Sequence, residues 1–303
     1  MASILTNVSA MSALQTLRSI NSNLEKTQNN ISTGQRVSQA SDNAAYWSIA
    51  TTMRSDNGAL SAVQDAIGLG AAKVDTAYSG MESAIEVVKE IKKKLVTAQE
   101  GSVDSKKVQE EITQLQEQLK SIAESASFSG ENMIAGSGTQ SVISGFVRDS
   151  SGGVSVKKTD YVMKTTGDDA NVLFGTNTAG ALVTTAGILG ATSGALGISV
   201  NNLDVTNTST GYLDQALTAI ESALTKMTSA GAELGSVSTR IDLQEDFIAK
   251  LNASLERGIG RLVDADMNEE STRLKALQTQ QQLAIQSLSI ANSDSQNILQ
   301  LFR

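Results

Sequence analysis

An unbroken row of apolar residues, spaced by alternate steps of three and four, constrains the fold most strongly. The row runs from Leu60 to Ala98, and every one of its positions is apolar or Gly. Such spacing places one continuous stripe along a single helix. At 1.5 Å per residue, about 50 residues form a rod of roughly 75 Å, which is too long for a compact globule. The sequence therefore predicts a long helix of the coiled-coil kind.

Two further rows predict partners for this helix. The first runs from Val108 to Ala126 after a break at 100–102, so we expect this helix to fold back on the first one. The second row has an apolar residue at every seventh position from Leu213 to Leu262. Its companion row begins with apolar residues and then becomes small or polar, at Gly231, Ser238, Glu245 and Asn252. The predicted fold is mainly α, with long antiparallel helices that have one apolar seam and one mixed seam.

Each end of the chain carries a shorter amphipathic row in a different phase, and residues 261–273 reset the register. Helices of this kind bury too little surface alone to offset their ordering entropy. We therefore expect the two ends to pair and to gain order through self-association. The predicted self-assembly residues are Ala10, Leu17, Ile20, Leu24, Ile31, Leu274, Leu277, Ala284, Leu288, Ala291, Ile298 and Phe302.

The polar link between the first two helical rows is either a binding site or a joint. Its distinctive residues are Gly34, Arg36, Asp42 and Asn43. Gly34 suits the left-handed position that ends a helix, and Ser41 or Asp42 can cap the next one. These residue types favour a joint. Tyr46 and Trp47, the only Trp, follow at once and are predicted to pack at the start of the second helix.

Residues 128–210 are rich in Gly, Ser and Thr and contain short apolar stretches at 141–147 and 161–163. They predict a small insert of short strands and loops. The expected domains are a terminal paired-helix domain (1–40 with 265–303), a helical rod (41–127 with 211–264) and the insert (128–210).

Composition excludes most enzyme classes. The chain has no Cys and no His, so it cannot form a thiolate nucleophile, an imidazole base or an ordinary zinc site. The net charge of -8 argues against nucleic acid and anionic membranes as partners. No stretch is long and apolar enough for a membrane span, and the N-terminus lacks the basic residues of a cleavable signal. We expect no cofactor.

Two motifs that resemble ligand sites fail on spacing. A calcium loop starting at Asp264 would need Gly at its sixth position and Glu at its twelfth, where Glu269 and Lys275 stand. Gly68 and Gly70 lie inside the helical row, so they do not form a phosphate loop and are expected to allow close helix approach. We expect no metal site.

The link and the C-terminus together resemble bacterial flagellin. Ser32, Gly34, Arg36, Val37, Ala40, Asp42, Asn43, Ala44 and Ala45 are similar to the family segment S-x-G-x-R-(I/V)-x-x-A-x-D-(D/N)-A-A. Near the other end, Leu234-Gly235 with Arg240, Asp264-Ala-Asp266, Ala291-Asn292 and the final 299–303 are similar to its C-terminal motifs, with Ser295 where Pro is usual. The short insert, the lack of His and the Tyr-Trp pair look most like rhizobial, alphaproteobacterial flagellins.

The resemblance implies an extracellular subunit, exported unfolded through the flagellar type III channel, that polymerises with itself or related flagellins. It implies that the two ends form the innermost layer of a tubular filament and the insert faces solvent. It further implies filament-cap, hook-junction and export-chaperone partners. Family receptors in plants and animals read the opening segment and an Arg-rich part of the rod. Tyr46-Trp47 and residues 91–94 differ there, so host recognition does not follow.

Two other functions are compatible with parts of this pattern. A junction protein between hook and filament would resemble flagellin at both ends, although the closeness of the motifs favours the bulk subunit. Some flagellins carry a zinc protease in the insert, but the absence of His excludes its metal site. The sequence therefore predicts a structural, non-enzymatic protein.

Overall fold

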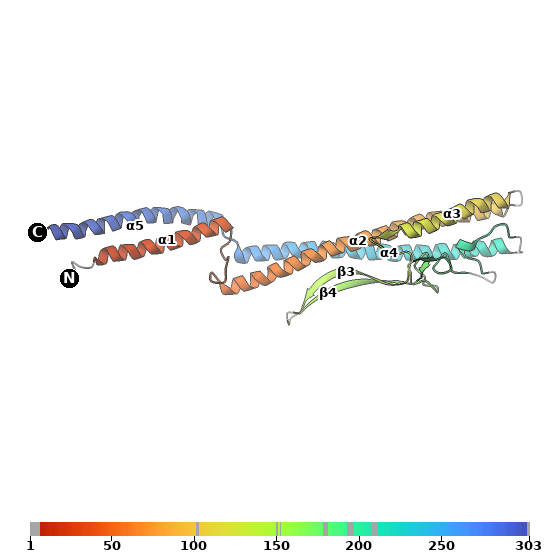
Figure 1. Cartoon of the computed structure of the whole chain (residues 1–303), viewed down its shortest axis with the longest axis horizontal. Coiled ribbons are helices and arrows are strands. Elements are labelled where there is room, and N and C mark those ends of the chain that lie inside the picture. Colours follow the sequence, from red (N-terminus) through yellow and green to blue (C-terminus); the bar gives the residue numbers. More distant parts are fainter. Residues whose placement is uncertain are drawn as a thin grey trace. The chain divides into compact units, whose positions relative to one another are not determined.

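A computed structural model of the chain describes residues 7–100, 103–149, 151, 153–177, 181–192, 197–207 and 211–301, with the backbone alone for 294–301. Five α-helices lie in these residues: α1 (Val8–Thr33), α2 (Ala44–Ala98), α3 (Ser105–Ser125), α4 (Tyr212–Val263) and α5 (Met267–Leu301) (Figure 1). The prediction of a mainly helical chain is confirmed. Two of the three residues predicted to form the turn between α2 and α3, Gly101 and Ser102, lie outside the described residues.

The chain divides into two compact units, each formed by segments that are far apart in the sequence. The first contains Met1–Gly58 and Ala253–Arg303, and the second contains Ala59–Asn252. No helix among the described residues is long and apolar enough to cross a membrane.

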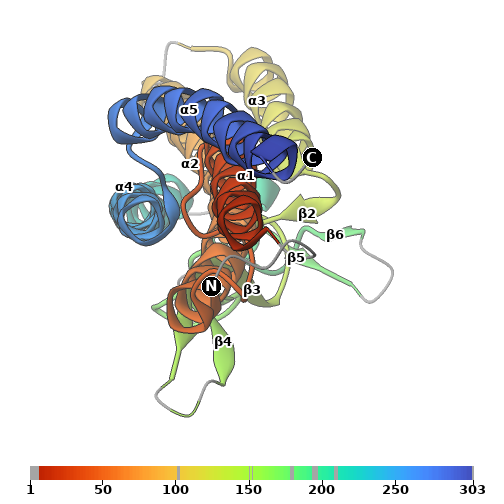
Figure 2. The same cartoon turned by 90° about the vertical axis from the view of Figure 1, so that its left-hand side faces the viewer.

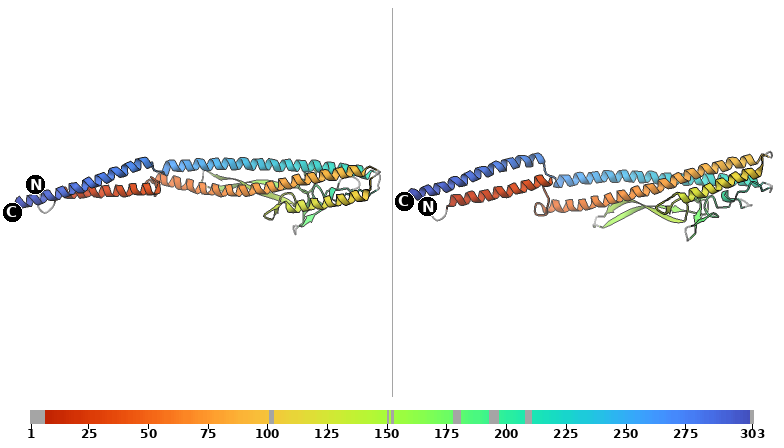
Figure 3. Two further views of the ribbon diagram at one scale, coloured as in Figure 1. Left: turned by 90° about the horizontal axis from the view of Figure 1, so that it is seen from above. Right: turned by 45° about the horizontal axis from the view of Figure 1, so that its top comes forward.

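In the first unit, α1 and α5 run side by side in opposite directions (Figure 3). Asn7 donates to the carbonyl oxygen of Ala291 at 2.9 Å, and Gln281 donates to Asn21 at 2.8 Å. Asn7 also caps α1, because its side chain accepts from the backbone N–H of Ala10. The prediction that the two ends of the chain pair is therefore confirmed.

The second unit is built on the long apolar row. Its members on α2 from Leu60 to Ala98 are all buried, facing rows of buried residues on α3 and α4. Lysines at the edges join the helices: Lys92 pairs with Glu221 of α4, and Lys94 pairs with Glu111 of α3. These ion pairs are exposed, so we assign the main stabilisation to the apolar row.

The insert forms short antiparallel strand pairs and a small core of its own. The pairs are β1 (Ser127–Phe128) with β2 (Glu131–Asn132), β3 (Gly138–Arg148) with β4 (Val154–Met163), and β5 (Gly175–Thr176) with β6 (Leu182–Val183). A 3-10 turn, η1 (Val200–Asn202), precedes α4. The core contains Tyr161, Leu173, Phe174, Leu189 and Ile198, each at most 2% exposed.

The β3–β4 hairpin packs on α2 through one close contact. Gly70 faces Val142, and a side chain at Gly70 would overlap that valine, whereas Gly68 has open space around it. The prediction that these glycines allow close helix approach is thus corrected, because a strand rather than a helix approaches Gly70. Figure 2 shows the hairpin on the side of the second unit opposite α3.

Candidate assembly surfaces and helix joint

The predicted self-assembly residues form the seam between α1 and α5 within one chain. On α1, Ala10, Leu17, Ile20, Leu24 and Ile31 are partly covered, while the positions beside them are mostly exposed. On α5, Leu277 is buried and Leu274, Ala284, Leu288 and Ala291 are partly covered. The side chain of Ile298, and Phe302 as a whole, lie outside the described residues. These rows therefore hold the pair together, and any role in contacts between copies is additional.

Large apolar side chains remain exposed on the outside of this pair. They are Val8 (67%), Met11 (59%) and Leu14 (39%) on α1, with Leu283 (59%), Ile285 (53%) and Ile290 (68%) on α5. Sequence reasoning missed them, because it followed only the strongest row on each helix. The signal was present as apolar residues out of phase with that row. Exposed apolar patches of this kind mark interaction surfaces.

The link between α1 and α2 is fastened by backbone hydrogen bonds to the link between α4 and α5. Gly34 has φ +71°, the left-handed conformation predicted for a residue that ends a helix. The N–H groups of Arg36 and Val37 both donate to the carbonyl of Val263, at 2.6 and 3.2 Å. In return Ala265 donates to the carbonyl of Gly34 at 2.9 Å. The segment is therefore a joint in which two chain connections meet.

Side chains complete this joint. The guanidinium of Arg36 donates to the carbonyl of Leu262 at 3.3 Å. The carboxylate of Asp42 accepts from the backbone N–H of Gln39 at 3.2 Å and of Ser38 at 3.1 Å, and Lys26 lies 3.5 Å away. The hydrogen bond from Gln39, then those from Ser38 and the charge of Lys26, hold the pKa of Asp42 below its usual value against the opposing effect of burial.

Asn43, rather than Ser41 or Asp42, caps α2. Its side-chain oxygen accepts from the backbone N–H of Tyr46 at 3.1 Å. The predicted cap was wrong because three adjacent residues all suit the role, and Asp42 is occupied in closing the preceding loop. Tyr46 and Trp47 are 41% and 37% exposed, so the prediction that they pack is not met within the single chain.

The acidic stretch that begins α5 is also structural. Asp266 accepts from the N–H groups of Asn268 and Glu269, so it caps the helix. Glu270 is 5% exposed and accepts from Asn30 of α1 and from Arg273. Among the described residues no group of three or more acidic side chains is arranged to hold a metal ion.

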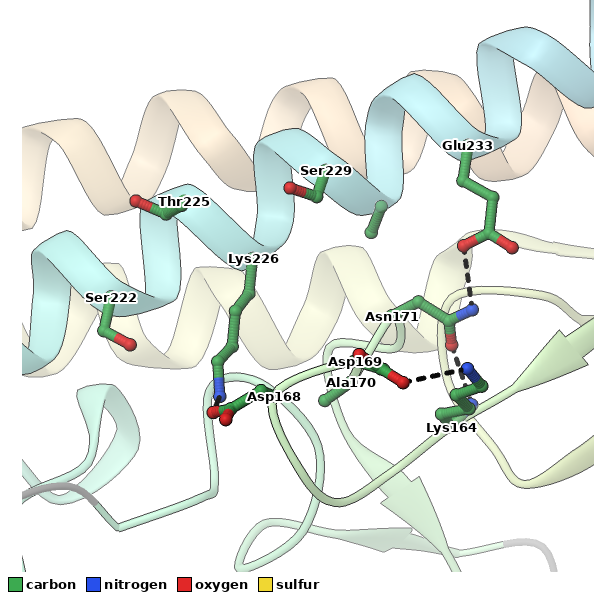
Figure 4. A pocket seen from close by; sticks show the side chains of 11 residues that line it. Lys164, Asp168, Asp169, Ala170, Asn171, Ser222, Thr225, Lys226, Ser229 and Glu233 are labelled. Carbon is green, nitrogen blue, oxygen red and sulfur yellow. Dashed lines mark hydrogen bonds and ion pairs between the residues drawn. The ribbon is translucent and has the colours of Figure 1, made fainter.

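A polar groove of about 770 Å³ lies where the insert meets α4 (Figure 4). Its charged groups have partners within the groove region: Asn171 donates to Glu233 at 3.2 Å, Lys226 donates to the carbonyl of Gly167 at 3.1 Å, and Lys164 pairs with Asp169. Beneath it, burial and then the charge of Glu233 raise the pKa of Tyr161. We interpret these contacts as fastening the insert to α4.

Comparison with protein families identifies the family of this chain. The profile "Bacterial flagellin N-terminal helical region" matches residues 4–139, and "Bacterial flagellin C-terminal helical region" matches residues 217–302. The chain belongs to the bacterial flagellin family. It is 54% identical to Flagellin A and 57% identical to Flagellin B of Rhizobium meliloti (strain 1021), over the whole of each chain.

A more distant relative agrees with this assignment. The protein is 46% identical to a flagellin of Brucella melitensis, again over all of both chains. A solved structure of a putative flagellar hook-associated protein from Vibrio parahaemolyticus aligns with 74% of this chain and all of its own, at 17% identity and a TM-score of 0.46. That last likeness is too remote to support an argument.

As a flagellin, the protein is the structural subunit of the extracellular filament of the bacterial flagellum and polymerises with itself. The predictions of family, rhizobial type, non-enzymatic function and location are confirmed. Full-length identity to proteins named as flagellins favours the filament subunit over the junction protein. The outer apolar faces of α1 and α5 are therefore the leading candidates for contacts between subunits.

Proposed function

We propose that the α1–α5 pair (1–40 with 265–303) forms the inner layer of the filament. In this proposal the rod (41–127 with 211–264) forms the next layer, and the insert (128–210) faces solvent. The observation that carries the proposal is the set of exposed apolar side chains on the outside of the pair. Ile290 is 68% exposed and Val8 is 67% exposed, so the pair presents apolar surface to water until other copies cover it.

The proposal divides the apolar residues of the pair between two tasks. The seam residues, such as Leu17 and Leu277, join α1 to α5 within one subunit. The outer residues contact neighbouring copies. On α5, Leu283 and Ile290 are seven residues apart and share one flank, while Ile285 lies on the other flank. A pair with apolar residues on two flanks can contact a neighbour on each side, as a continuous layer requires.

Export and the accessory partners are also part of this proposal. A chain without Cys cannot be trapped by disulfides while it is unfolded, which suits passage through a narrow export channel. The exposed apolar faces of α1 and α5 would need cover before assembly, and an export chaperone would supply it. The filament cap and the hook-junction proteins would meet the same faces at the two ends of the filament.

A substitution on one flank of α5 tests the inner-layer assignment. We expect Ile290→Glu to prevent elongation from short filament seeds, since full burial of an isoleucine contributes about 1.5–3 kcal/mol and a buried unpaired carboxylate costs more. Ile290→Leu keeps an apolar side chain at the same position and is the matched control, which should elongate normally. Elongation would be followed by electron microscopy, with circular dichroism to confirm that helix content is unchanged.

Truncation provides the second arm of this test. The full chain should form long tubes from seeds, whereas a chain lacking 265–303 should remain monomeric with its rod still folded. Long tubes from the truncated chain, or normal elongation of Ile290→Glu, would refute the inner-layer proposal. Short caps on seeds from the intact chain would instead favour the junction function.

A further inference from the structure

The methionines of this chain differ sharply in their exposure to solvent. The chain has eight Met and no Cys, so thioethers are its only sulfur groups. Among the described residues, Met11 is 59% exposed and Met267 is 44% exposed. Four others are shielded in the core, each at most 7% exposed: Met81, Met133, Met163 and Met227. A solvent-borne oxidant therefore reaches Met11 and Met267 well before these four.

Met11 lies in the first turn of α1 and is surrounded by other exposed apolar side chains. Ala10 and Ala13 beside it are partly covered in the seam with α5, whereas Met11 is not. Val8 and Leu14, three residues before and after it, are 67% and 39% exposed. Because residues three apart are neighbours on a helix surface, these side chains form one apolar patch with the Met11 thioether at its centre. We call Val8, Met11 and Leu14 the α1 patch.

Oxidation would change the α1 patch from apolar to polar at its centre. A two-electron oxidant such as hydrogen peroxide reacts with a lone pair of the thioether sulfur. The O–O bond breaks, one oxygen stays bonded to sulfur as the sulfoxide, and the other leaves as water with both protons of the peroxide. Sulfur loses two electrons and the peroxide gains them. The new oxygen is a hydrogen-bond acceptor, so covering it with an apolar surface costs desolvation energy that no partner repays.

We propose that Met11 is an oxidation site at which peroxide blocks polymerisation, and that assembly shields it. The inference rests on the proposed function, in which neighbouring copies cover the outer apolar residues of α1. A free subunit presents the thioether to solvent, and after oxidation its α1 patch binds a neighbour more weakly. A subunit within a filament keeps the thioether covered. The block is reversible, because methionine sulfoxide reductases restore the thioether.

Met267 provides a matched control in the same unit. It is the first residue of α5 and is exposed, so it should also be oxidised in the free subunit. The nearest exposed large apolar residue on α5 among those described is Leu283, more than four turns away. A sulfoxide at Met267 therefore lies outside the apolar faces of the pair and keeps its oxygen in water, so it should affect polymerisation little.

Seeded elongation after peroxide treatment tests the site. Monomers of the wild type, Met11→Leu and Met267→Leu would be treated with hydrogen peroxide, freed of it and added to untreated seeds. Each protein is compared with its own untreated sample by the critical concentration, the monomer concentration at which filaments stop growing. Oxidation should raise this concentration about tenfold for the wild type and Met267→Leu and leave it unchanged for Met11→Leu. Reductase treatment should reverse the rise. An equal rise in Met11→Leu, or no reversal by the reductase, would overturn the proposal.

Peptide mass spectrometry separates this inference from the proposed function. The rate of oxidation at Met11 would be measured in monomers and in filaments, with buried Met81 as the reference for a shielded thioether. We expect Met11 to react about tenfold more slowly in filaments, since oxidation follows exposure. Equal rates would overturn both the inference and the placement of α1 in the inner layer. Slow oxidation in filaments, together with normal elongation of oxidised monomers, would overturn the inference alone.

Discussion

Replacing Gly70 by Ala should destabilise the second unit, although alanine is the better helix former. The α2 helix would gain about 1 kcal/mol in propensity. The new Cβ would, however, overlap Cγ1 of Val142 and lie 3.3 Å from its Cβ. Val142 is β-branched and 5% exposed, so it has little freedom to rotate away. Overpacking of this kind costs about 1–3 kcal/mol, which leaves a net loss of about 0–2 kcal/mol.

Gly68→Ala is the matched control two residues away. An added Cβ there meets nothing within 4 Å, so this variant should be stabilised by about 1 kcal/mol. The two substitutions are chemically identical and should shift the thermal midpoint in opposite directions, with about 2–4 °C for each kcal/mol in a unit of this size.

The assay is thermal unfolding of the monomer followed by circular dichroism. In a Val142→Ala background the overlapping methyl groups are gone, and Gly70→Ala should then cost much less than in the wild type. If Gly70→Ala stabilised the wild-type protein as much as Gly68→Ala does, the close packing of the hairpin on α2 would be refuted.

Two further predictions concern the joint and the start of α2. The hydrogen bonds to Asp42 lower its folded-state pKa, so its contribution to stability should be present above about pH 4 and lost as the pH falls through the lowered value. Urea unfolding from pH 5 to pH 2 should show this loss, and Asp42→Asn should flatten the curve; identical curves would contradict the role of Asp42. Trp47 is 37% exposed in the single chain, so its fluorescence should shift to shorter wavelength on polymerisation if neighbours cover the exposed side chains beside it. An emission maximum that is the same in filaments and monomers would exclude this residue from the contacts.

The long helices were predictable because a regular apolar row admits few folds. Every member of the apolar row from Leu60 to Ala98 is buried, and the phase change between Leu262 and Leu274 corresponds to the end of α4 and the start of α5. The short strands were predicted in kind, since 141–147 and 161–163 lie within β3 and β4. Their register was not, because the irregularity between Ile143 and Gly145 depends on packing across the pair.

The helix cap, the exposed apolar residues and the close contact at Gly70 could not be predicted fully, because several residues suit each role and the sequence pattern does not choose among them. Ser41, Asp42 and Asn43 are all good helix caps, and the loop geometry selects Asn43. On α5 the strongest row identified the seam with α1, but Leu283 and Ile290 became informative only once that seam was seen to leave them exposed. The sequence predicted a close approach at Gly70, but it did not identify the approaching element, because Val142 on β3 is far away in the sequence.

The joint has a mechanical consequence for a subunit of a rotating shaft. Tension or torque entering along α1 reaches α2 through the covalent chain, and it also reaches the end of α4 through the hydrogen bonds from Arg36, Val37 and Ala265. The load is therefore carried by two parallel paths across one short crossing. We therefore expect a substitution that weakens one link to soften the crossing without severing it.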